Sequence, residues 1–231
     1  MKSLRNSFLL LLMLFGVSVS FISAQEEEKS DSPFSVGADI YSSYVWRGTK
    51  FAGPSIQPSL SYTTGGLTVG VWGSYGTVLM SPYVPYYETD PYISYGFDFG
   101  LSLGLTAYYY EGDISKMSDT TSSFAYEVNL GYSIKGLSLS ANYILNDSHA
   151  GALSAGGDKY FQAQYDFKNF SLFAGAGDGW HTSDGDFAFC NIGLSTSKTI
   201  DVTDKFSIPV SGSVIVNPDK KQMFLVVGFS F

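Results

Sequence analysis

The sequence predicts an all-β protein, a transmembrane antiparallel up-and-down β-barrel of about 12 strands. Three observations favour this fold: segments in which apolar and polar residues alternate, long connections that alternate with tight turns, and aromatic residues at both ends of the expected strands. Alternation gives a strand one apolar and one polar face. In lipid such strands must close into a barrel, because an open sheet edge leaves backbone groups without partners.

The last nine residues, Met223–Phe231, show the alternation most clearly. Every second residue counted from the end is large and apolar: Phe231, Phe229, Val227, Leu225 and Met223. We expect this segment to close the barrel by pairing with the first strand, since an exposed apolar edge promotes aggregation. The terminal aromatic also resembles the signal that the barrel-assembly machinery recognises, which makes that machinery an expected partner.

The amino terminus has the features of a secretory signal over residues 1–24. Lys2 and Arg5 precede an apolar core too short to span a membrane, and small residues follow at the expected cleavage site. A signal anchor is the alternative. Residues 25–33 are acidic and polar and predict a flexible periplasmic lead-in, which leaves residues 34–231 for the barrel.

Charge and cysteine content exclude some partners and bonds. Removing residues 1–24 takes away Lys2 and Arg5 but no acid, which leaves 11 basic and 21 acidic residues and a net charge near −10. Nucleic acid is therefore not an expected partner, because its phosphates attract basic proteins. Cys190 is the single cysteine, so it cannot form an internal disulfide and is predicted to pack as a small hydrophobe.

Twelve segments carry the alternation, and their lengths suit tilted membrane strands. They cover residues 34–47, 55–63, 67–77, 88–97, 99–110, 124–134, 137–145, 159–167, 170–180, 187–197, 206–216 and 223–231. Connections after even-numbered segments are mostly tight, as expected of periplasmic turns, and the connection 198–205 is an exception. Pro58, Pro91 and Pro209 fall inside expected strands, where bulges or shifted boundaries would accommodate them.

Aromatic residues on the outward register predict two belts, where amphipathic rings prefer to lie. The periplasmic belt contains Phe34, Tyr62, Phe97, Phe99, Tyr132, Phe167, Phe170, Phe206, Phe229 and Phe231. The outer belt contains Tyr44, Trp46, Tyr75, Tyr109, Phe124, Tyr126, Tyr143, Phe161 and Trp180. The two belts make outer-membrane lipid an expected partner.

Several short motifs resemble one known family. They are Gly37-Ala38-Asp39, Ser43-Tyr44-Val45-Trp46-Arg47-Gly48, Gly53-Pro54, Gln57-Pro58, Val71-Trp72-Gly73-Ser74-Tyr75, Glu88-x-Asp90, Asn191-Ile192-Gly193-Leu194, residues 204–210, Asn217-Pro218 and the last strand. Together they resemble the TorF-type porins and their Bacteroidetes relatives at both ends of the mature chain. The resemblance implies an outer-membrane, porin-like barrel and brings no catalytic residues.

Five charged residues fall on the inward register and are expected in the lumen: Asp39, Arg47, Glu88, Asp90 and Glu127. Arg47, Glu88 and Asp90 are expected at similar depth near the outer end. Two interpretations stay open: a salt-bridged network that fills a narrow lumen, and a selectivity constriction of opposed charges. Because acids outnumber Arg47, we predict a weak preference for cations or neutral solutes.

The inward register also places aromatic residues in the lumen. They are Tyr41, Trp72, Tyr92, Tyr108, Tyr110 and Tyr160, together with Phe173, Phe187 and Phe189. These rings could stack on sugars or nucleobases, as in narrow substrate-specific channels. The alternative is that they pack the lumen of a mid-sized barrel.

The expected outer loops hold the residues with catalytic or metal-binding potential. His149 and His181 lie there, and His181 has Ser183 and Asp184 nearby, a combination that an outer-membrane hydrolase could use. The chain has no Gly-x-Ser-x-Gly elbow, and residues so close in sequence seldom form a triad. Three acids could bind calcium, although not with EF-hand spacing: Asp178, Asp184 and Asp186. We predict no catalytic, cofactor-binding or metal-binding residues and no cofactor.

The sequence favours a passive channel for small solutes in the cell outer membrane. A closed barrel that anchors or structures the envelope is the alternative, and an outer-membrane hydrolase is a remote one. Nothing in the outward registers marks an interface between protomers, so the oligomeric state stays open.

Overall fold

The computed structural model of the chain describes residues 32–77, 85–110, 115, 123–148, 154–204 and 206–231. The expected secretory signal and most of the expected lead-in lie outside these residues. No helix in the described part of the chain is long and apolar enough to cross a membrane.

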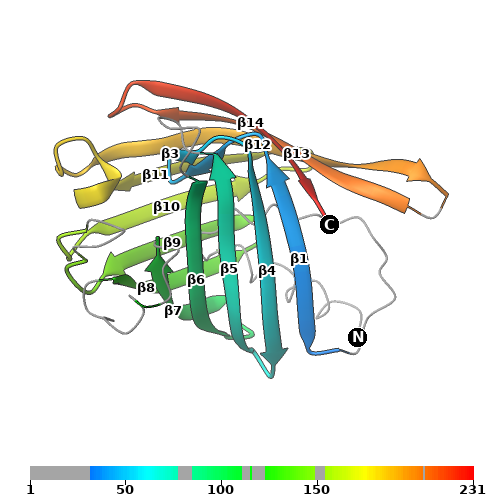
Figure 1. Ribbon diagram of the computed structural model, residues 1–231, viewed down its shortest axis with the longest axis horizontal. Helices are drawn as coiled ribbons and strands as arrows, with labels where there is room; N and C mark the ends of the chain where they lie inside the picture. Colours follow the sequence, from blue (N-terminus) through cyan, green and yellow to red (C-terminus); the bar gives the residue numbers. More distant parts are fainter. Residues whose placement is uncertain (1–31, 78–84, 111–114, 116–122, 149–153, 205) are drawn as a thin grey trace.

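Twelve strands of the described residues close into one antiparallel barrel, which confirms the fold class expected from the sequence (Figure 1). The wall strands are β1 (Phe34–Tyr41), β4 (Ser55–Thr64), β5 (Leu67–Thr77), β6 (Pro85–Gly96), β7 (Leu101–Tyr109), β8 (Phe124–Ile134), β9 (Leu137–Ile144), β10 (Lys159–Asp166), β11 (Ser171–Gly177), β12 (Ala188–Thr203), β13 (Phe206–Asn217) and β14 (Gln222–Ser230). Two further strands, β2 (Tyr44–Trp46) and β3 (Thr49–Ala52), form a separate hairpin that is not part of the wall.

The barrel closes between β14 and β1, as the terminal alternation predicts. Asp39, one of the expected lumen charges, is half-buried at this seam and pairs with Ser230. The Phe231 N–H donates to the Ala38 carbonyl at 3.0 Å, and the Ala38 N–H donates to the Phe231 carbonyl at 3.1 Å. The seam is short, because its register covers only Asp39 to Tyr41, whereas β1 pairs with β4 along its whole length.

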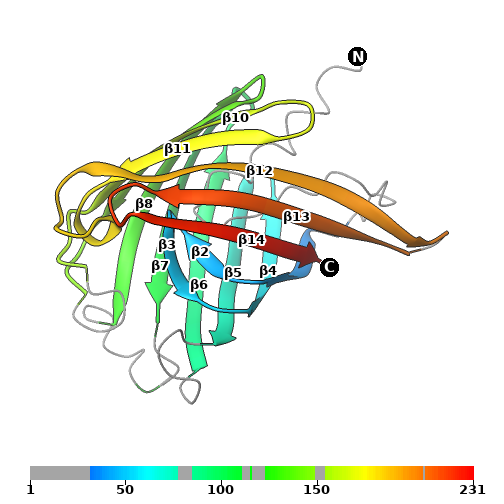
Figure 2. The same cartoon turned by 90° about the horizontal axis from the view of Figure 1, so that it is seen from above.

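Tight turns gather at one end of the barrel, called here the turn end, and the opposite end is called the loop end. The turns cover residues 65–66, 97–100, 135–136 and 167–170. The connection 198–205, expected as an exception, is mostly strand: β12 continues to Thr203 and β13 begins at Phe206. These two strands therefore project beyond the rest of the wall (Figure 2).

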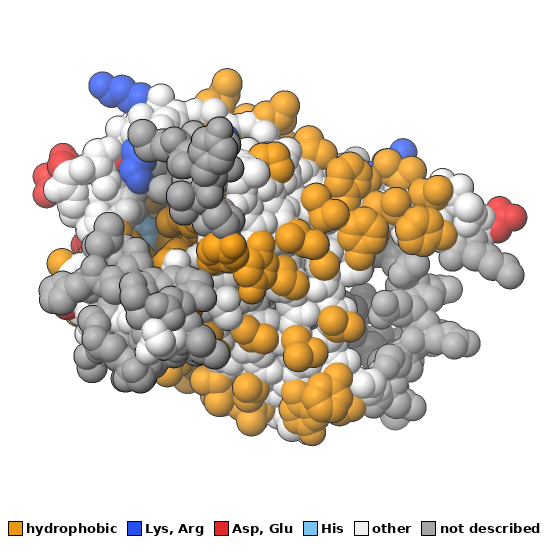
Figure 3. Space-filling model, viewed as in Figure 1, with side chains coloured by type: hydrophobic (Ala, Val, Ile, Leu, Met, Phe, Trp, Pro, Cys, Tyr) orange, Lys and Arg blue, Asp and Glu red, His pale blue; other side chains and the backbone are white. Residues whose placement is uncertain are grey.

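Every wall strand exposes large apolar side chains on its outer face. On the face formed by β1, β4, β5 and β6 these side chains extend across the wall, and charged side chains lie at the margins (Figure 3). Most of the belt expected at the turn end is exposed there: Phe34, Tyr62, Phe99, Phe167, Phe170, Phe206, Phe229 and Phe231. Such a surface is unfavourable in water and suits lipid.

The first expected strand, residues 34–47, is wrong at its carboxyl end. β1 ends at Tyr41, and the chain then turns into the lumen as the β2–β3 hairpin. Tyr44, Val45 and Trp46 are all buried. Three consecutive apolar side chains cannot all face lipid from one strand, whereas a hairpin enclosed by the barrel buries both of its faces.

The expected outer belt is partly wrong. The two hairpin rings leave the wall, and Trp180 lies in a short 3₁₀ helix, η3 (Gly179–His181), rather than at the end of a strand. Tyr109 and Phe124 keep the outward register but are buried and stacked, with ring centroids 4.8 Å apart. Other members of the belt are exposed at the loop end: Tyr75, Tyr143 and Phe161.

A β-bulge at Cys190 reverses two further expectations. The register of β11 with β12 shifts between Gly175 and Ala176, so that Cys190 is an extra residue of β12. The sequence predicts Phe187 and Phe189 in the lumen, but both are exposed. Cys190 itself is fully buried.

The prolines inside strands fall where a ladder is interrupted or ends. β4 skips its pairing with β5 around Pro58 without a change of register. The β6–β7 pairing begins at Tyr92, directly after Pro91, and the β13–β14 pairing begins at Val210, directly after Pro209. Because proline has no N–H, it is tolerated where no ladder bond is made. Neither bulges nor shifted boundaries are needed at these positions.

Candidate functional site in the barrel lumen

The β2–β3 hairpin extends into the lumen and its tip is held by β12 and β13. Arg47 and Gly48 form its turn with φ angles of 48° and 77°, the two positive φ angles of a type I′ turn. A Cβ on Gly48 would overlap the Cys190 carbonyl oxygen, so that only glycine fits. Asn217 Nδ2 donates to the Gly48 carbonyl at 3.0 Å. Two strands near the carboxyl terminus, β12 and β13, therefore hold a hairpin that lies near the amino terminus of the chain.

The side chain of Arg47 forms a bidentate ion pair with Glu127 of β8. Arg47 Nη1 donates to Glu127 Oε1 at 2.6 Å, and Nη2 donates to Oε2 at 2.8 Å. Tyr108 Oη and Asn129 Nδ2 also donate to Oε2, at 2.8 and 2.6 Å. Arg47 and Glu127 are 6% and 0% exposed. Loss of either partner would therefore leave a buried charge without compensation.

Aromatic rings enclose the Arg47 guanidinium. Its Cζ lies 4.3 Å from the Trp46 ring centroid and 4.4 Å from the Tyr160 ring centroid, within cation–π range. Trp180 Nε1 donates to His181 Nε2 at 2.8 Å, and Arg47 Nη1 lies 3.5 Å from the same nitrogen. His181 Nε2 is therefore an acceptor, and the ring is neutral. Burial and the Arg47 charge hold the pKa of His181 well below its usual value.

Glu88 and Asp90 of β6, expected at the depth of Arg47, make no ion pair with it. Tyr86 Oη donates to Glu88 Oε2 at 2.7 Å, and the Tyr109 N–H donates to Asp90 Oδ1 at 3.3 Å. Both carboxyl groups are buried, and no described lysine or arginine pairs with either. The structure thus brings Arg47 together with Glu127 and leaves the other two acids apart from this pair.

Aromatic side chains fill the lumen around the hairpin. The buried cluster contains Tyr44, Trp46, Ala52, Trp72, Tyr108, Ala125 and Ile144, with Phe51, Tyr86, Tyr110 and Trp180 packed against it. The rings of Tyr44 and Trp72 lie 5.6 Å apart, and those of Trp46 and Tyr108 lie 5.4 Å apart. Of the expected lumen aromatics, Trp72, Tyr108 and Tyr110 belong to this packing. The hairpin and this cluster are together called the plug.

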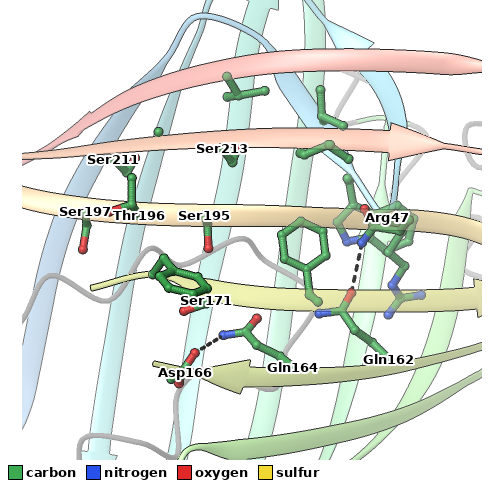
Figure 4. Close-up of a pocket in the computed structure, with 18 of the residues that line it drawn as sticks. Arg47, Gln162, Gln164, Asp166, Ser171, Ser195, Thr196, Ser197, Ser211 and Ser213 are labelled. Atoms are coloured by element: carbon green, nitrogen blue, oxygen red, sulfur yellow. Dashed lines mark hydrogen bonds between the residues drawn. The ribbon is translucent and has the colours of Figure 1, made fainter. Parts of the chain in front are cut away.

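On the turn side of the plug the lumen contains a cavity of about 490 Å³, called here the chamber. Arg47 lines its closed end, and the turn residues Lys168 and Asn169 line its other end. Most of its lining consists of hydroxyl and amide side chains, among them Gln162, Gln164, Ser171, Ser195, Ser197, Ser211 and Ser213. Figure 4 shows these side chains on β10 to β13 around one space.

Strand pairing arranges the hydroxyl groups in rows across the wall. Ser171 of β11 pairs with Ser195 of β12, which pairs with Ser213 of β13. One step closer to the turn end, Ser197 pairs with Ser211. Because paired residues on one face lie about 4.5–5.5 Å apart, the rows form a continuous uncharged surface.

Inward aromatic side chains cover glycines of neighbouring strands. The pairs are Tyr41 over Gly228, Tyr160 over Gly175, Phe173 over Gly193 and Tyr92 over Gly70. A Cβ on any of these glycines would point into the lumen and overlap the ring. The first three rings line the chamber, so its wall alternates rings with hydroxyl rows.

The residues considered for hydrolysis or calcium binding are not assembled into a site. Ser183 Oγ donates to Asp219 Oδ2 at 2.8 Å, whereas His181 Nε2 accepts from the neighbouring indole. Asp178 forms an ion pair with a lysine of β10. Among the residues that the structure describes, no group of three or more His, Cys, Asp or Glu could hold a metal ion. His149 lies outside the described residues.

Several chamber residues carry neither charge nor ring and were not predicted from the sequence. Asn191 Nδ2 donates to Tyr160 Oη at 2.9 Å and to Gln162 Oε1 at 3.0 Å, which joins β12 to β10 at the closed end. The sequence did contain a pattern that indicates such residues: Gln162 and Gln164 are two residues apart and therefore lie on one face of the strand. Ser195 and Ser197 of β12 have the same spacing, as do Ser211 and Ser213 of β13.

No protein-family model and no curated protein matches the chain. Among solved structures, engineered variants of the porin of Rhodopseudomonas blastica are similar at 17% identity and a TM-score of 0.43, over 77% of this chain and 55% of the porin chain. A further solved porin is similar at 15% identity and a TM-score of 0.34, over 78% and 62% of the two chains. The chain thus spans little more than half of the porins it matches. TM-scores this low carry no argument about function, and the resemblance to TorF-type porins is not confirmed.

Proposed function

We propose that the protein is an outer-membrane channel for small solutes and that the β2–β3 hairpin is its gate. The apolar outer wall supports a place in lipid, and short turns facing the periplasm would direct the chamber to that side. One observation carries the proposal: the plug that closes the chamber is built around a hairpin that belongs to no wall strand. Such a hairpin can move without opening the wall of the barrel.

The proposal includes a weak preference for cations or neutral solutes. The charge of Arg47 is compensated by Glu127, whereas no described base pairs with Glu88 or Asp90. A relationship to the TorF-type porins also belongs to the proposal, supported by motifs that include the hairpin turn, Trp46-Arg47-Gly48. The barrel-assembly machinery is the proposed partner of β14.

A closed barrel that serves the envelope structurally is the second candidate. The contacts that fix the hairpin favour it, in particular the ion pair of Arg47 and the hydrogen bond of Asn217 to Gly48. A permanent plug of this kind predicts a folded barrel without conductance. The chamber favours the channel, because a purely structural barrel has no need of a polar cavity beside its plug.

Planar-bilayer recordings of a cross-linked barrel distinguish the two candidates. Lys220 Nζ donates to Thr49 Oγ1 at 2.9 Å, so cysteines at these two positions, with Cys190→Ala, can be joined by a short reducible bis-methanethiosulfonate linker. The channel proposal expects openings before linking, their loss after linking and their return on reduction. Thr49→Cys alone, treated with the same reagent, should keep its openings. A folded barrel that never conducts would support the permanent plug.

A further inference from the structure

We infer that the chamber binds a neutral, polyhydroxylated small molecule of the class of mono- to trisaccharides. The inference rests on the proposed channel function, because it names the class of solute that the same lumen would admit. Four features of the chamber support it: its size and single closed end, the absence of an unpaired buried charge among its described lining residues, its hydroxyl rows and its aromatic rings.

The chamber has the size and enclosure of a small-molecule site. Its volume of about 490 Å³ falls within the range of roughly 300–1,000 Å³ that such sites occupy. The plug closes one end at Arg47, and the turn residues Lys168 and Asn169 mark the other end. A ligand that enters from the turn end would be surrounded by wall strands on its sides and by the plug at its tip.

The lining favours a ligand without net charge. Apart from tyrosines, the ionisable residues in the described part of its lining are Arg47, Asp166 and Lys168. Both Nη atoms of Arg47 are bound by Glu127, and Asp166 Oδ1 accepts a hydrogen bond from Gln164 Nε2 at 2.8 Å. Lys168 is exposed at the turn. An ionic ligand would lose hydration on entry and find no buried counter-charge, which is costly.

The polar groups match hydroxyl groups, which both donate and accept hydrogen bonds. Serine hydroxyls have the same double capacity, and the rows that contain Ser195 and Ser211 extend it across three strands. At the closed end two buried atoms, Arg47 Nε and Asn191 Oδ1, have no hydrogen-bond partner in the described part of the chain. The first is a donor and the second an acceptor, and both are covered by protein, so a ligand hydroxyl would pair with either only after the surrounding side chains move.

The aromatic rings that line the chamber favour sugars over nucleobases. Tyr41 and Phe173 cover Gly228 and Gly193 and line the chamber, which places apolar surface beside the hydroxyl rows. A sugar ring has apolar C–H faces and an edge of hydroxyl groups, so it matches both surfaces together. A nucleobase would use the aromatic rings but leave most of the serine hydroxyls without partners.

Calorimetric titration of the purified barrel tests the inference. The protein is held in lauryldimethylamine oxide, because glucoside and maltoside detergents would compete for the site. Glucose, maltose and maltotriose are titrated beside gluconate, glucosamine and adenosine. We expect at least one neutral saccharide to bind roughly tenfold or more tightly than the charged analogues and adenosine, which is about 1.4 kcal/mol in binding free energy. Tighter binding of a charged analogue or of adenosine would overturn the inference.

Two variants locate the binding. Asn191→Leu removes the amide that holds Tyr160 and Gln162 at the closed end, and Phe173→Leu removes a ring. Each should weaken saccharide binding roughly tenfold. Thr68→Val is the matched control, because Thr68 faces inward on β5 but does not line the chamber. Migration of unheated samples on gels confirms that each variant is folded, and unchanged saccharide binding in both folded chamber variants would overturn the inference.

The outcomes also separate the inference from the proposed channel. Conductance without saccharide binding would overturn the saccharide class and leave the channel standing. Saccharide binding without conductance would support the chamber as a binding site and count against the channel.

Discussion

Arg47 and Glu127, 80 residues apart in the chain, form a bidentate ion pair inside the barrel. Arg47 lies at the tip of the β2–β3 hairpin, and Glu127 lies on β8 with two further donors bound to the same carboxylate. The pair therefore links the plug to the wall at a distance from β1, where the hairpin originates. It is the contact whose loss should change the plug most.

Replacing Glu127 by Gln should loosen the plug. The Arg47 guanidinium would stay buried without a counter-charge, which costs about 3–5 kcal/mol in buried pairs. We expect a lower free energy of unfolding in urea and more frequent openings in planar bilayers. Combining Glu127→Gln with Arg47→Met removes both charges and should recover part of the stability. Equal losses in the single and double variants would show that the ion pair does not hold the plug.

Gly48→Ala should displace the hairpin tip. Alanine disfavours the φ angle of 77°, and its Cβ would overlap the Cys190 carbonyl oxygen. The buried thiol of Cys190 should then react with maleimide roughly tenfold or more faster, equivalent to about 1.4 kcal/mol in the free energy of opening. Gly212→Ala is the matched control, because a Cβ there meets no atom within 4 Å. Equal labelling rates in both variants would contradict the position of the hairpin tip against Cys190.

Deleting Phe231 should impair assembly rather than conductance. The deletion removes both backbone hydrogen bonds with Ala38 from a seam that has a short register. We expect less heat-modifiable barrel in outer-membrane fractions, measured by gel shift. Phe231→Ala keeps the backbone bonds and reports the contribution of the ring alone. Normal membrane levels of the deletion variant would show that the seam tolerates the loss.

Acid should destabilise the protein through His181. Its pKa in the folded state lies well below the unfolded value of about 6.5, because burial and Arg47 oppose a positive charge. Below about pH 6.5 the unfolded chain binds a proton that the folded chain does not. The free energy of unfolding therefore decreases as the pH is lowered. Urea unfolding between pH 8 and 5 measures the slope. His181→Gln should reduce the slope, and an identical slope in both proteins would exclude His181 as its source.

The wall strands could be predicted from the sequence, because each has one face toward the apolar outside of the barrel and one face toward the lumen along its whole length. β5 and β8 begin and end at the expected residues, Leu67–Thr77 and Phe124–Ile134. The bulge could not be predicted in the same way, since Phe189 and Cys190 are both apolar and fit either face. A single extra residue there reverses the register that follows from periodicity.

The plug could not be predicted, because its partners lie far away in the chain. Tyr44 and Trp46 continue the alternation of β1, and only the contacts with distant wall strands show that the chain has left the wall. Periodicity predicts the face of a charged residue and not its partner. Arg47 was therefore expected near Glu88 and Asp90, whereas Glu127 is its partner.

The anchorage of the hairpin has a consequence for the order of folding. Strands β12 and β13 hold Gly48, although the hairpin is made long before them. Contacts so distant in sequence form late, because they close a long loop of chain. A chain that lacks its last strands would leave Val45 of the hairpin without its packing partners Ile215 and Val226. The hairpin, which is synthesised early, therefore reaches its final position only when the last strands of the barrel are in place.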